Sequence, residues 1–278
     1  METKYFTVCN LAFLGRALTL AESLQKQDIR LLIYVFDKRV NLNSLPDYAE
    51  LVWVEELDIT NFKHLAFKYD ITELSTSLKA YIAKSLLTNE ISKVIFLDPD
   101  THVYSSLRPL EQELETHPII LTPHFTSPNE EGDLALMRFG SFNLGFFGVN
   151  NTKEGLNFLE WWHERCIDYC FFEPQWGLST DQKWVTIAPC FFPNLKVLFH
   201  QGLNMAPWNL HERSLKHLEG DSYVVNDKED LLFFHFSSFD IDDPMKLSKR
   251  LPLATKRYDE FKKIIQVYAE SLRKHNEI

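Results

Sequence analysis

Two aspartates, Asp98 and Asp100, flank Pro99 directly after the apolar run VIFL. Carboxylates at the end of a buried strand lose hydration, so they need a partner such as a cation. Two carboxylates one residue apart on a turn can face one hard cation, and Pro99 restricts the turn between them. A magnesium or manganese ion held there keeps open positions for substrate phosphates and neutralises charge on a diphosphate leaving group. A solvated turn or a cap explains the same pair, so the motif alone leaves both interpretations open.

The residues before the aspartates predict strands and helices in alternation. KYFTVCN is typical of a strand, residues 13–27 have apolar side chains at helical spacing, and RLLIYVF is typical of a strand buried on both faces. These segments predict a βαβ unit and a parallel sheet. Residues 50–57 and 93–97 predict two more strands, with a long helix between them that begins at Thr72 or Glu73 and ends near Asn89. Ligands of such sheets bind beyond the carboxyl ends of the strands, where the aspartates stand.

The second half of the chain is less regular. FNLGFFGVN predicts a strand in which Gly145 and Gly148 let another group approach the backbone. Residues 152–170 predict a helix, and residues 179–191 predict the opening of another with Ser179 or Thr180 as its N-cap. Residues 195–199 and 230–240 predict strands, and residues 255–274 a closing helix with one apolar stripe. We expect one continuous α/β domain.

Composition excludes several classes of protein. The net charge of −10 argues against general nucleic-acid binding. Residues 245–278 carry nine Lys or Arg against four Asp or Glu, so this tail is basic and residues 1–244 carry −15. The start lacks the pattern of a secretory signal, and no apolar run approaches the roughly 20 residues of a membrane-spanning helix. The four cysteines have no metal-finger spacing, so we expect buried free thiols in a reducing, cytoplasmic setting.

Five segments carry a resemblance to a known family. FTVCN, SLKAYIAKSLLTNEISKVIFLDPD, FNLGFFGVN, STDQKWV and HFSSFD occur in that order. They resemble motifs of the retaining family 8 glycosyltransferases, of the glycogenin and bacterial galactosyltransferase type, and of related bacterial polysaccharide enzymes. The resemblance covers most of residues 5–240. It implies a GT-A fold, which is Rossmann-like α/β with a mixed central sheet, over residues 1–244, followed by a basic helical tail over residues 245–278.

The resemblance also implies roles for individual residues. The implied metal ligands are Asp98, Asp100 and His235. The implied catalytic residues are Lys79, Asp181 and Gln182. Contacts to the nucleotide, its phosphates or the sugar are implied for Thr7, Asn10, Lys79, Asp98, Asn143, Gly145 and Ser237, with Thr7 and Asn10 on the loop of the first strand. The sequence departs from the family after His235, where no Lys-Pro-Trp follows, and Ser237 or Ser238 could donate hydrogen bonds instead.

The implied reaction is transfer of a hexose from a nucleotide diphosphate sugar, expected to be uridine-linked, to a saccharide or lipid-linked acceptor. The resemblance implies Mn²⁺ or Mg²⁺ as cofactor, retention of configuration and a place in surface glycan (polysaccharide) biosynthesis. Inversion would instead need a base such as Asp181 near the acceptor hydroxyl. The basic tail could lie on an anionic membrane, or its apolar stripe could dock onto the catalytic domain.

Other interpretations remain open at this stage. A D-x-D phosphatase would use Asp98 as nucleophile, but His102 stands where that motif wants Thr or Val. A non-catalytic nucleotide-sugar or carbohydrate-binding protein would need the same pocket. Single residues also have structural explanations: His235 could be a core histidine, Asp181 an acid that favours the start of a helix, and Lys79 a solvated helix residue. Trp208 could belong to the core, or it could form a sugar-binding face with the neighbouring Asn204, Asn209 and His211.

Overall fold

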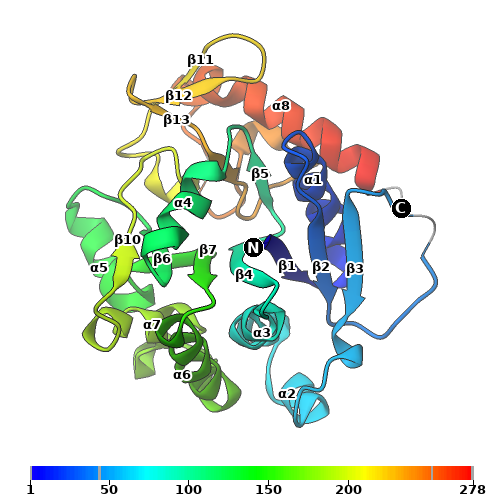
Figure 1. The fold of residues 1–278 in the computed structure, drawn as a ribbon. Coiled ribbons are helices and arrows are strands. Elements are labelled where there is room, and N and C mark those ends of the chain that lie inside the picture. Colours follow the sequence, from blue (N-terminus) through cyan, green and yellow to red (C-terminus); the bar gives the residue numbers. More distant parts are fainter. Residues whose placement is uncertain (1, 43–44, 252, 277–278) are drawn as a thin grey trace.

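A seven-stranded mixed sheet forms the centre of the computed structural model, which describes residues 2–42, 45–251 and 253–276 (Figure 1). In spatial order the strands are β10 (Leu195–Val197), β6 (Ile119–Pro123), β7 (Phe142–Asn150), β4 (Ile91–Leu97), β1 (Glu2–Cys9), β2 (Leu31–Val35) and β3 (Ala49–Trp53). Only β7 runs antiparallel to its neighbours, β4 and β6. The α/β class and the mixed central sheet expected from the sequence are therefore confirmed.

Helices cover both faces of this sheet. On one face lie α3 (Ile71–Leu86) and α6 (Lys153–Tyr169), which pack over Phe6 and Phe96. On the other lie α1 (Leu14–Gln25) and α4 (Arg108–Thr116), which pack over Tyr5 and Ile95. Because successive strand residues point to opposite faces, the buried residues 5–9 of β1 and 94–97 of β4 are apolar on both faces, apart from Thr7. This double burial explains the continuous apolar runs in the sequence.

A short antiparallel strand pairing joins two distant parts of the chain near the end of β4. The turn of residues 98–100 leads into β5 (Thr101–Val103), which pairs antiparallel with β14 (Phe233–His235). The register places His235 opposite Thr101, and the N–H of Phe236 donates to the carbonyl oxygen of Asp100 at 2.7 Å. On the other side, the N–H of Asp98 donates to the carbonyl oxygen of Gly145 at 2.8 Å. The turn is therefore fixed between β7 and β14.

The C-terminal helix α8 (Tyr258–His275) packs onto the body of the protein beside α1 (Figure 1). Its apolar stripe is buried, and the ring of Tyr268 stacks on Phe236 with centroids 3.8 Å apart. At its end Lys274 and His275 both pair with Glu22 of α1. Of the two interpretations of the tail, the docked one is confirmed. The domain boundary at residue 244 stays a prediction.

A docked α8 leads to a test with membranes. We expect the full-length chain not to float with anionic vesicles at low salt, because Phe261, Ile265 and Leu272 are already buried. Leu272→Ala should instead lower the free energy of unfolding by about 2–5 kcal/mol, since it leaves a cavity in the core. Denaturant titration measures this loss, with the exposed Lys262→Ala as control. Flotation of the parent chain at low salt would contradict the docked helix.

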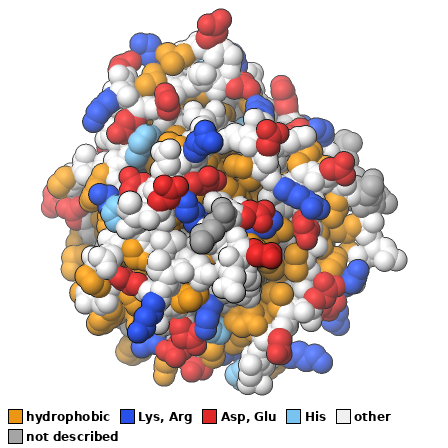
Figure 2. Space-filling model, viewed as in Figure 1, with side chains coloured by type: hydrophobic (Ala, Val, Ile, Leu, Met, Phe, Trp, Pro, Cys, Tyr) orange, Lys and Arg blue, Asp and Glu red, His pale blue; other side chains and the backbone are white. Residues whose placement is uncertain are grey.

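None of the described helices is long and apolar enough to cross a membrane. On the face drawn in Figure 2, acidic and basic side chains of the described residues are interspersed. The lysines and arginines of this face therefore stand among carboxylates.

Several helix boundaries differ from the sequence prediction. Asp70, and not Thr72 or Glu73, is the N-cap of α3: its carboxylate accepts from the N–H of Glu73 at 2.8 Å, and the Glu73 carboxylate accepts from the N–H of Asp70. The helix ends at Leu86, before Asn89. The predicted helix over residues 179–191 is only the four-residue α7 (Gln182–Val185), with Ser179 in strand β9 (Leu178–Ser179).

The sequence prediction omitted the shorter elements. These are α2 (Phe62–Lys68), α5 (Glu130–Phe139), β8 (Phe172–Glu173), β11 (Leu215–His217), β12 (Tyr223–Val225) and β13 (Glu229–Asp230), besides β5, β6, β9 and α4. All four cysteines are free; three are buried as expected, but Cys190 is exposed.

Candidate active site

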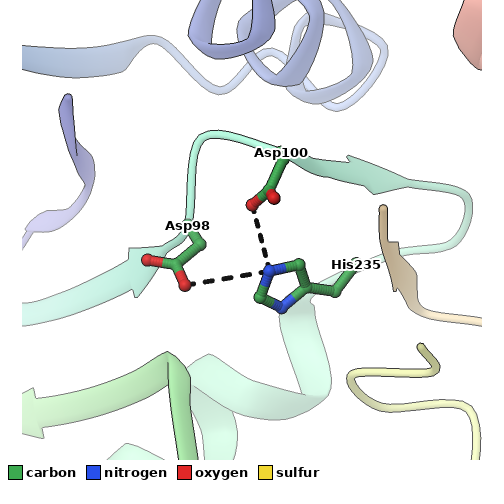
Figure 3. A group of neighbouring side chains, drawn as sticks. All are labelled: Asp98, Asp100 and His235. Carbon is green, nitrogen blue, oxygen red and sulfur yellow. Dashed lines mark ion pairs between the residues drawn. The ribbon is translucent and has the colours of Figure 1, made fainter. Parts of the chain in front are cut away.

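Three predicted metal ligands meet at the carboxyl end of β4 (Figure 3). Asp98 follows β4, Asp100 lies in the turn before β5, and His235 ends β14. The Nε2 atom of His235 is 3.0 Å from an Asp100 oxygen and 3.8 Å from an Asp98 oxygen. One ligand atom from each residue lies within 4.8 Å of the others. The pairing of β14 with β5 thus brings together side chains that are far apart in the sequence.

The charges in this cluster stabilise one another. Burial would lower the pKa of His235, but Asp100 and Asp98 beside it raise that pKa above its usual value. Burial would raise the pKa of Asp100, but His235 and Arg16 lower it. The two aspartates therefore favour the protonated form of His235, and His235 favours the ionised form of Asp100.

The cluster fits a divalent cation. Two carboxylates and one imidazole are ligands that manganese accepts readily. Gly145 makes the space for the ring, since a Cβ atom at that position would lie 2.6 Å from Cε1 of His235. The requirement for glycine at this point of β7 is therefore a close approach of the histidine to the backbone.

Lys79 is a buried cation beside the cluster of Asp98, Asp100 and His235. Its side chain is 4% exposed, and its ammonium lies 3.2 Å from an Asp98 oxygen and 3.6 Å from an Asp181 oxygen. It also donates to the carbonyl oxygen of Leu144 at 2.9 Å. Burial would lower the pKa of Lys79, but Asp181 and Asp98 raise it, so the group stays charged. The alternative of a solvated helix lysine is therefore wrong.

Asp181 shares this buried environment. Burial raises its pKa to about 6 although Lys79 lowers it, and Asp98 raises it further. Asp181 is fully buried, and its Oδ2 atom has no hydrogen-bond partner within the described part of the chain. Asp181 is therefore a partner of Lys79 at the start of α7, closed off from solvent.

A network of side-chain amides lies beside the cluster. The Asn143 amide donates to Oε1 of Gln182 at 3.2 Å, and the same oxygen accepts from the N–H of Leu144 at 3.3 Å. The Asn143 oxygen accepts from the N–H of Gly145 and from Nδ2 of Asn204. Asn143, Gly145 and Gln182, all predicted site residues, are therefore connected directly.

The structure does not bring every predicted residue into this cluster. Thr7 lies inside β1 rather than on the following loop, is fully buried, and its hydroxyl has no partner among the described residues. The loop position predicted for Thr7 is therefore wrong. Asn10 caps the turn that follows β1, since its side-chain oxygen accepts from the N–H of Phe13 at 3.1 Å. Ser237 is half-buried two residues after His235. The binding roles of these three residues stay predictions.

His124 has no role in the sequence prediction, and Asn204 is named there only beside Trp208 as part of a sugar-binding face. His124, which follows β6, has its Nε2 atom 3.3 Å from the Asn143 amide nitrogen, and burial lowers its pKa to about 4. Asn204 lies between Asn143 and His235. Trp208, left open between core and sugar face, sets its ring edge-on to His235 with centroids 5.0 Å apart. The segment LNMAPWN carried the only signal, because it combines amides with an aromatic ring.

Comparisons with known proteins add two bacterial relatives. No family model matches the chain. The uncharacterized protein YfnF of Bacillus subtilis (strain 168) is 27% identical over 254 residues, which cover 87% of this chain and 83% of YfnF. The uncharacterized protein YfnD of the same strain is 32% identical over 145 residues, which cover 51% of this chain and 45% of YfnD.

Three of the solved structures to which this chain is similar are glycosyltransferases. Mouse xyloside xylosyltransferase 1 in its apo form has a TM-score of 0.46 and 14% identity, covering 74% of this chain and 88% of that one. A glycosyltransferase involved in the glycosylation of the major capsid of PBCV-1 has a TM-score of 0.47 and 11% identity, covering 94% and 99%. GlyE of Streptococcus pneumoniae TIGR4 has a TM-score of 0.49 and 15% identity, covering 98% and 63%. Likenesses at this level leave the function of the chain to the geometry of its site.

Proposed function

We propose that this chain is a metal-dependent glycosyltransferase that uses a nucleotide diphosphate sugar as donor. One observation carries the proposal: Asp98, Asp100 and His235 converge beyond the carboxyl end of β4, with the charged Lys79 held 3.2 Å from Asp98. A cation site with a second, buried positive charge beside it suits a diphosphate that gains negative charge as it leaves. The resemblance of the five motifs supports a uridine-linked hexose donor.

Each residue has a defined part in the proposed reaction. Asp98, Asp100 and His235 would hold Mn²⁺ or Mg²⁺, which when bound neutralises charge on the diphosphate. Lys79 adds a fixed positive charge, because its two carboxylate neighbours keep it protonated. Asn143 and Gln182 have amide groups that can orient sugar hydroxyls.

The burial of Asp181 supports retention of configuration. Inversion would need a base that reaches the acceptor hydroxyl. Asp181, the candidate for that base, is fully buried and faces Lys79. We therefore propose retention, with transfer to a saccharide or lipid-linked acceptor in surface glycan synthesis.

A panel of nucleotide sugars tests the proposed function. With manganese present, we expect one uridine-linked sugar to raise the melting temperature most and to be hydrolysed slowly without an acceptor. Calorimetry that detects binding while no sugar is hydrolysed or transferred would favour a non-catalytic binding protein. Hydrolysis of phosphate monoesters in place of nucleotide sugars would favour the phosphatase.

His235→Ala is expected to weaken manganese binding by at least about 10-fold, because one of three ligands is lost. Manganese should support more activity than magnesium, since an imidazole suits manganese better. The pH dependence gives a second test. The affinity for manganese should fall with decreasing pH, because the imidazole must lose a proton to bind metal. Since the pKa of His235 is raised from 6.5, this fall should begin above pH 6.5. Titration calorimetry at several pH values measures it, with His64→Ala on α2 as an exposed control. Unchanged manganese and donor affinity in His235→Ala would make the histidine a core residue only.

A further inference from the structure

Asn204 is a buried polar residue placed between His235 and Asn143. It is 1% exposed, and its backbone adopts a left-handed conformation with φ +53°. This conformation disfavours most side chains, although asparagine tolerates it. Its own carbonyl oxygen accepts from the side chain of Asn209 at 3.0 Å, which holds the segment in place. The side chain therefore projects from a backbone that is fixed independently of its two neighbours.

Hydrogen bonds determine which way the Asn204 amide points. The side-chain oxygen of Asn143 already accepts from the N–H of Gly145 at 3.1 Å, and it lies 2.9 Å from Nδ2 of Asn204. An oxygen can only accept, so the Asn204 nitrogen has to face Asn143. The Asn204 oxygen then faces Nδ1 of His235 at 3.3 Å. An amide oxygen also only accepts, so Nδ1 of His235 has to carry the proton.

The consequence concerns the other nitrogen of the ring. Nε2 of His235 faces both aspartates, at 3.0 Å from Asp100 and 3.8 Å from Asp98. A ring whose remaining proton is on Nδ1 has its lone pair on Nε2, which is the atom that a cation in this cluster would need. The space left by Gly145 and the ring of Trp208 limit how the imidazole can turn.

We propose that Asn204 is a positioning residue that keeps the proton of His235 on Nδ1 and so presents Nε2 to a divalent cation. The inference rests on the proposed metal site and deepens it. Partners that hydrogen-bond a ligating histidine typically change metal affinity by about 10–100-fold when they are removed. Through its nitrogen, the same amide also joins the metal ligand to Asn143 and Gln182.

Two substitutions separate the hydrogen bond from the backbone. Asn204→Gly removes the side chain, and glycine accepts the left-handed backbone without strain. Asn204→Asp keeps an acceptor oxygen towards His235 but loses the donor towards Asn143. Asn226→Gly is the matched control, because Asn226 also has φ +53° and its side chain also makes hydrogen bonds, to Ser214, Gln201 and Glu212, away from the cluster.

The first readout is nuclear magnetic resonance of protein loaded with zinc, a diamagnetic probe cation. The parent chain, Asn204→Asp and Asn226→Gly should show a slowly exchanging Nδ1 proton on His235, and Asn204→Gly should lose it. The second readout is manganese affinity by calorimetry, which should fall about 10–100-fold in Asn204→Gly alone. If Asn204 had a purely structural role, Asn204→Asp would not be expected to keep both the Nδ1 proton and the manganese affinity of the parent.

Several outcomes would overturn the inference. The first is an Asn204→Gly variant that keeps the Nδ1 proton and the manganese affinity of the parent. The second is an Asn204→Asp variant, or the control Asn226→Gly, that loses the Nδ1 proton and the manganese affinity as fully as Asn204→Gly does. If Asn204→Gly does not fold, the inference is instead overturned when Asn204→Asp lacks the Nδ1 proton. Failure of the proposed function is a separate result, because it would show as a parent chain that binds neither zinc nor manganese.

Discussion

Asp100→Asn is expected to abolish metal-dependent binding of the nucleotide sugar while the chain stays folded. The amide has nearly the shape of the carboxylate but no charge, so the cation loses a ligand and His235 loses its ion pair. We expect manganese affinity to fall by at least about 100-fold. Transfer should slow by roughly 10²–10³-fold, as when one group that stabilises transition-state charge is removed. Calorimetry with donor and manganese, and a transfer assay in chelator, measure both effects.

The matched control is Asp28→Asn. Asp28 is exposed in the turn that follows α1 and has a left-handed backbone that asparagine also accepts. It should bind metal and donor as the parent does. Undiminished donor affinity in Asp100→Asn, or full activity of the parent in chelator, would show that the aspartates hold no catalytic cation.

The first half of the fold could be predicted from the sequence because its signals are local. β2 and residues 94–97 of β4 are continuous apolar runs, the second half of β1 is rich in apolar residues, and α1 and α3 have apolar residues at helical spacing. The order of these elements then places Asp98 at the carboxyl end of a buried strand. The start of α3 was predicted at Thr72 or Glu73, but the helix begins after Asp70, because Asp70 and Glu73 form a capping box.

The second half could not be predicted to the same extent because long-range pairings determine it. β14 is three residues long and exists as a strand only because it pairs with β5. That pairing, and not any pattern near residue 235, brings His235 to the aspartates. Asn204 lies in a segment without regular structure, so no periodicity marks it. The family resemblance nevertheless indicated His235 as a metal ligand, because the resemblance depends on the order of motifs along the chain and not on local structure.

Lys79→Met should lower both stability and activity strongly. Methionine has similar length, but it leaves Asp181 and Asp98 without the cation that both contact. Breaking a buried ion pair by removing one partner typically costs about 3–5 kcal/mol of unfolding free energy. Transfer should fall by roughly 10²–10³-fold, because a fixed charge beside the diphosphate is lost. Denaturant titration and the transfer assay measure the two effects, and Lys84→Met on the exposed side of the same helix should change stability by less than about 1 kcal/mol.

The pH dependence identifies the cause of the lost stability. The pKa of Asp181 is already raised to about 6 with Lys79 present, so without the lysine it should rise further. A carboxyl group whose pKa is raised on folding destabilises the fold when ionised, so the deficit of Lys79→Met should shrink as pH falls through that pKa. The double variant Lys79→Met, Asp181→Asn should regain most of the stability at pH 7.5 and none of the activity. A double variant as unstable as Lys79→Met would show that Asp181 is not the destabilising charge. Parent-like transfer in the double variant would remove Lys79 from the reaction.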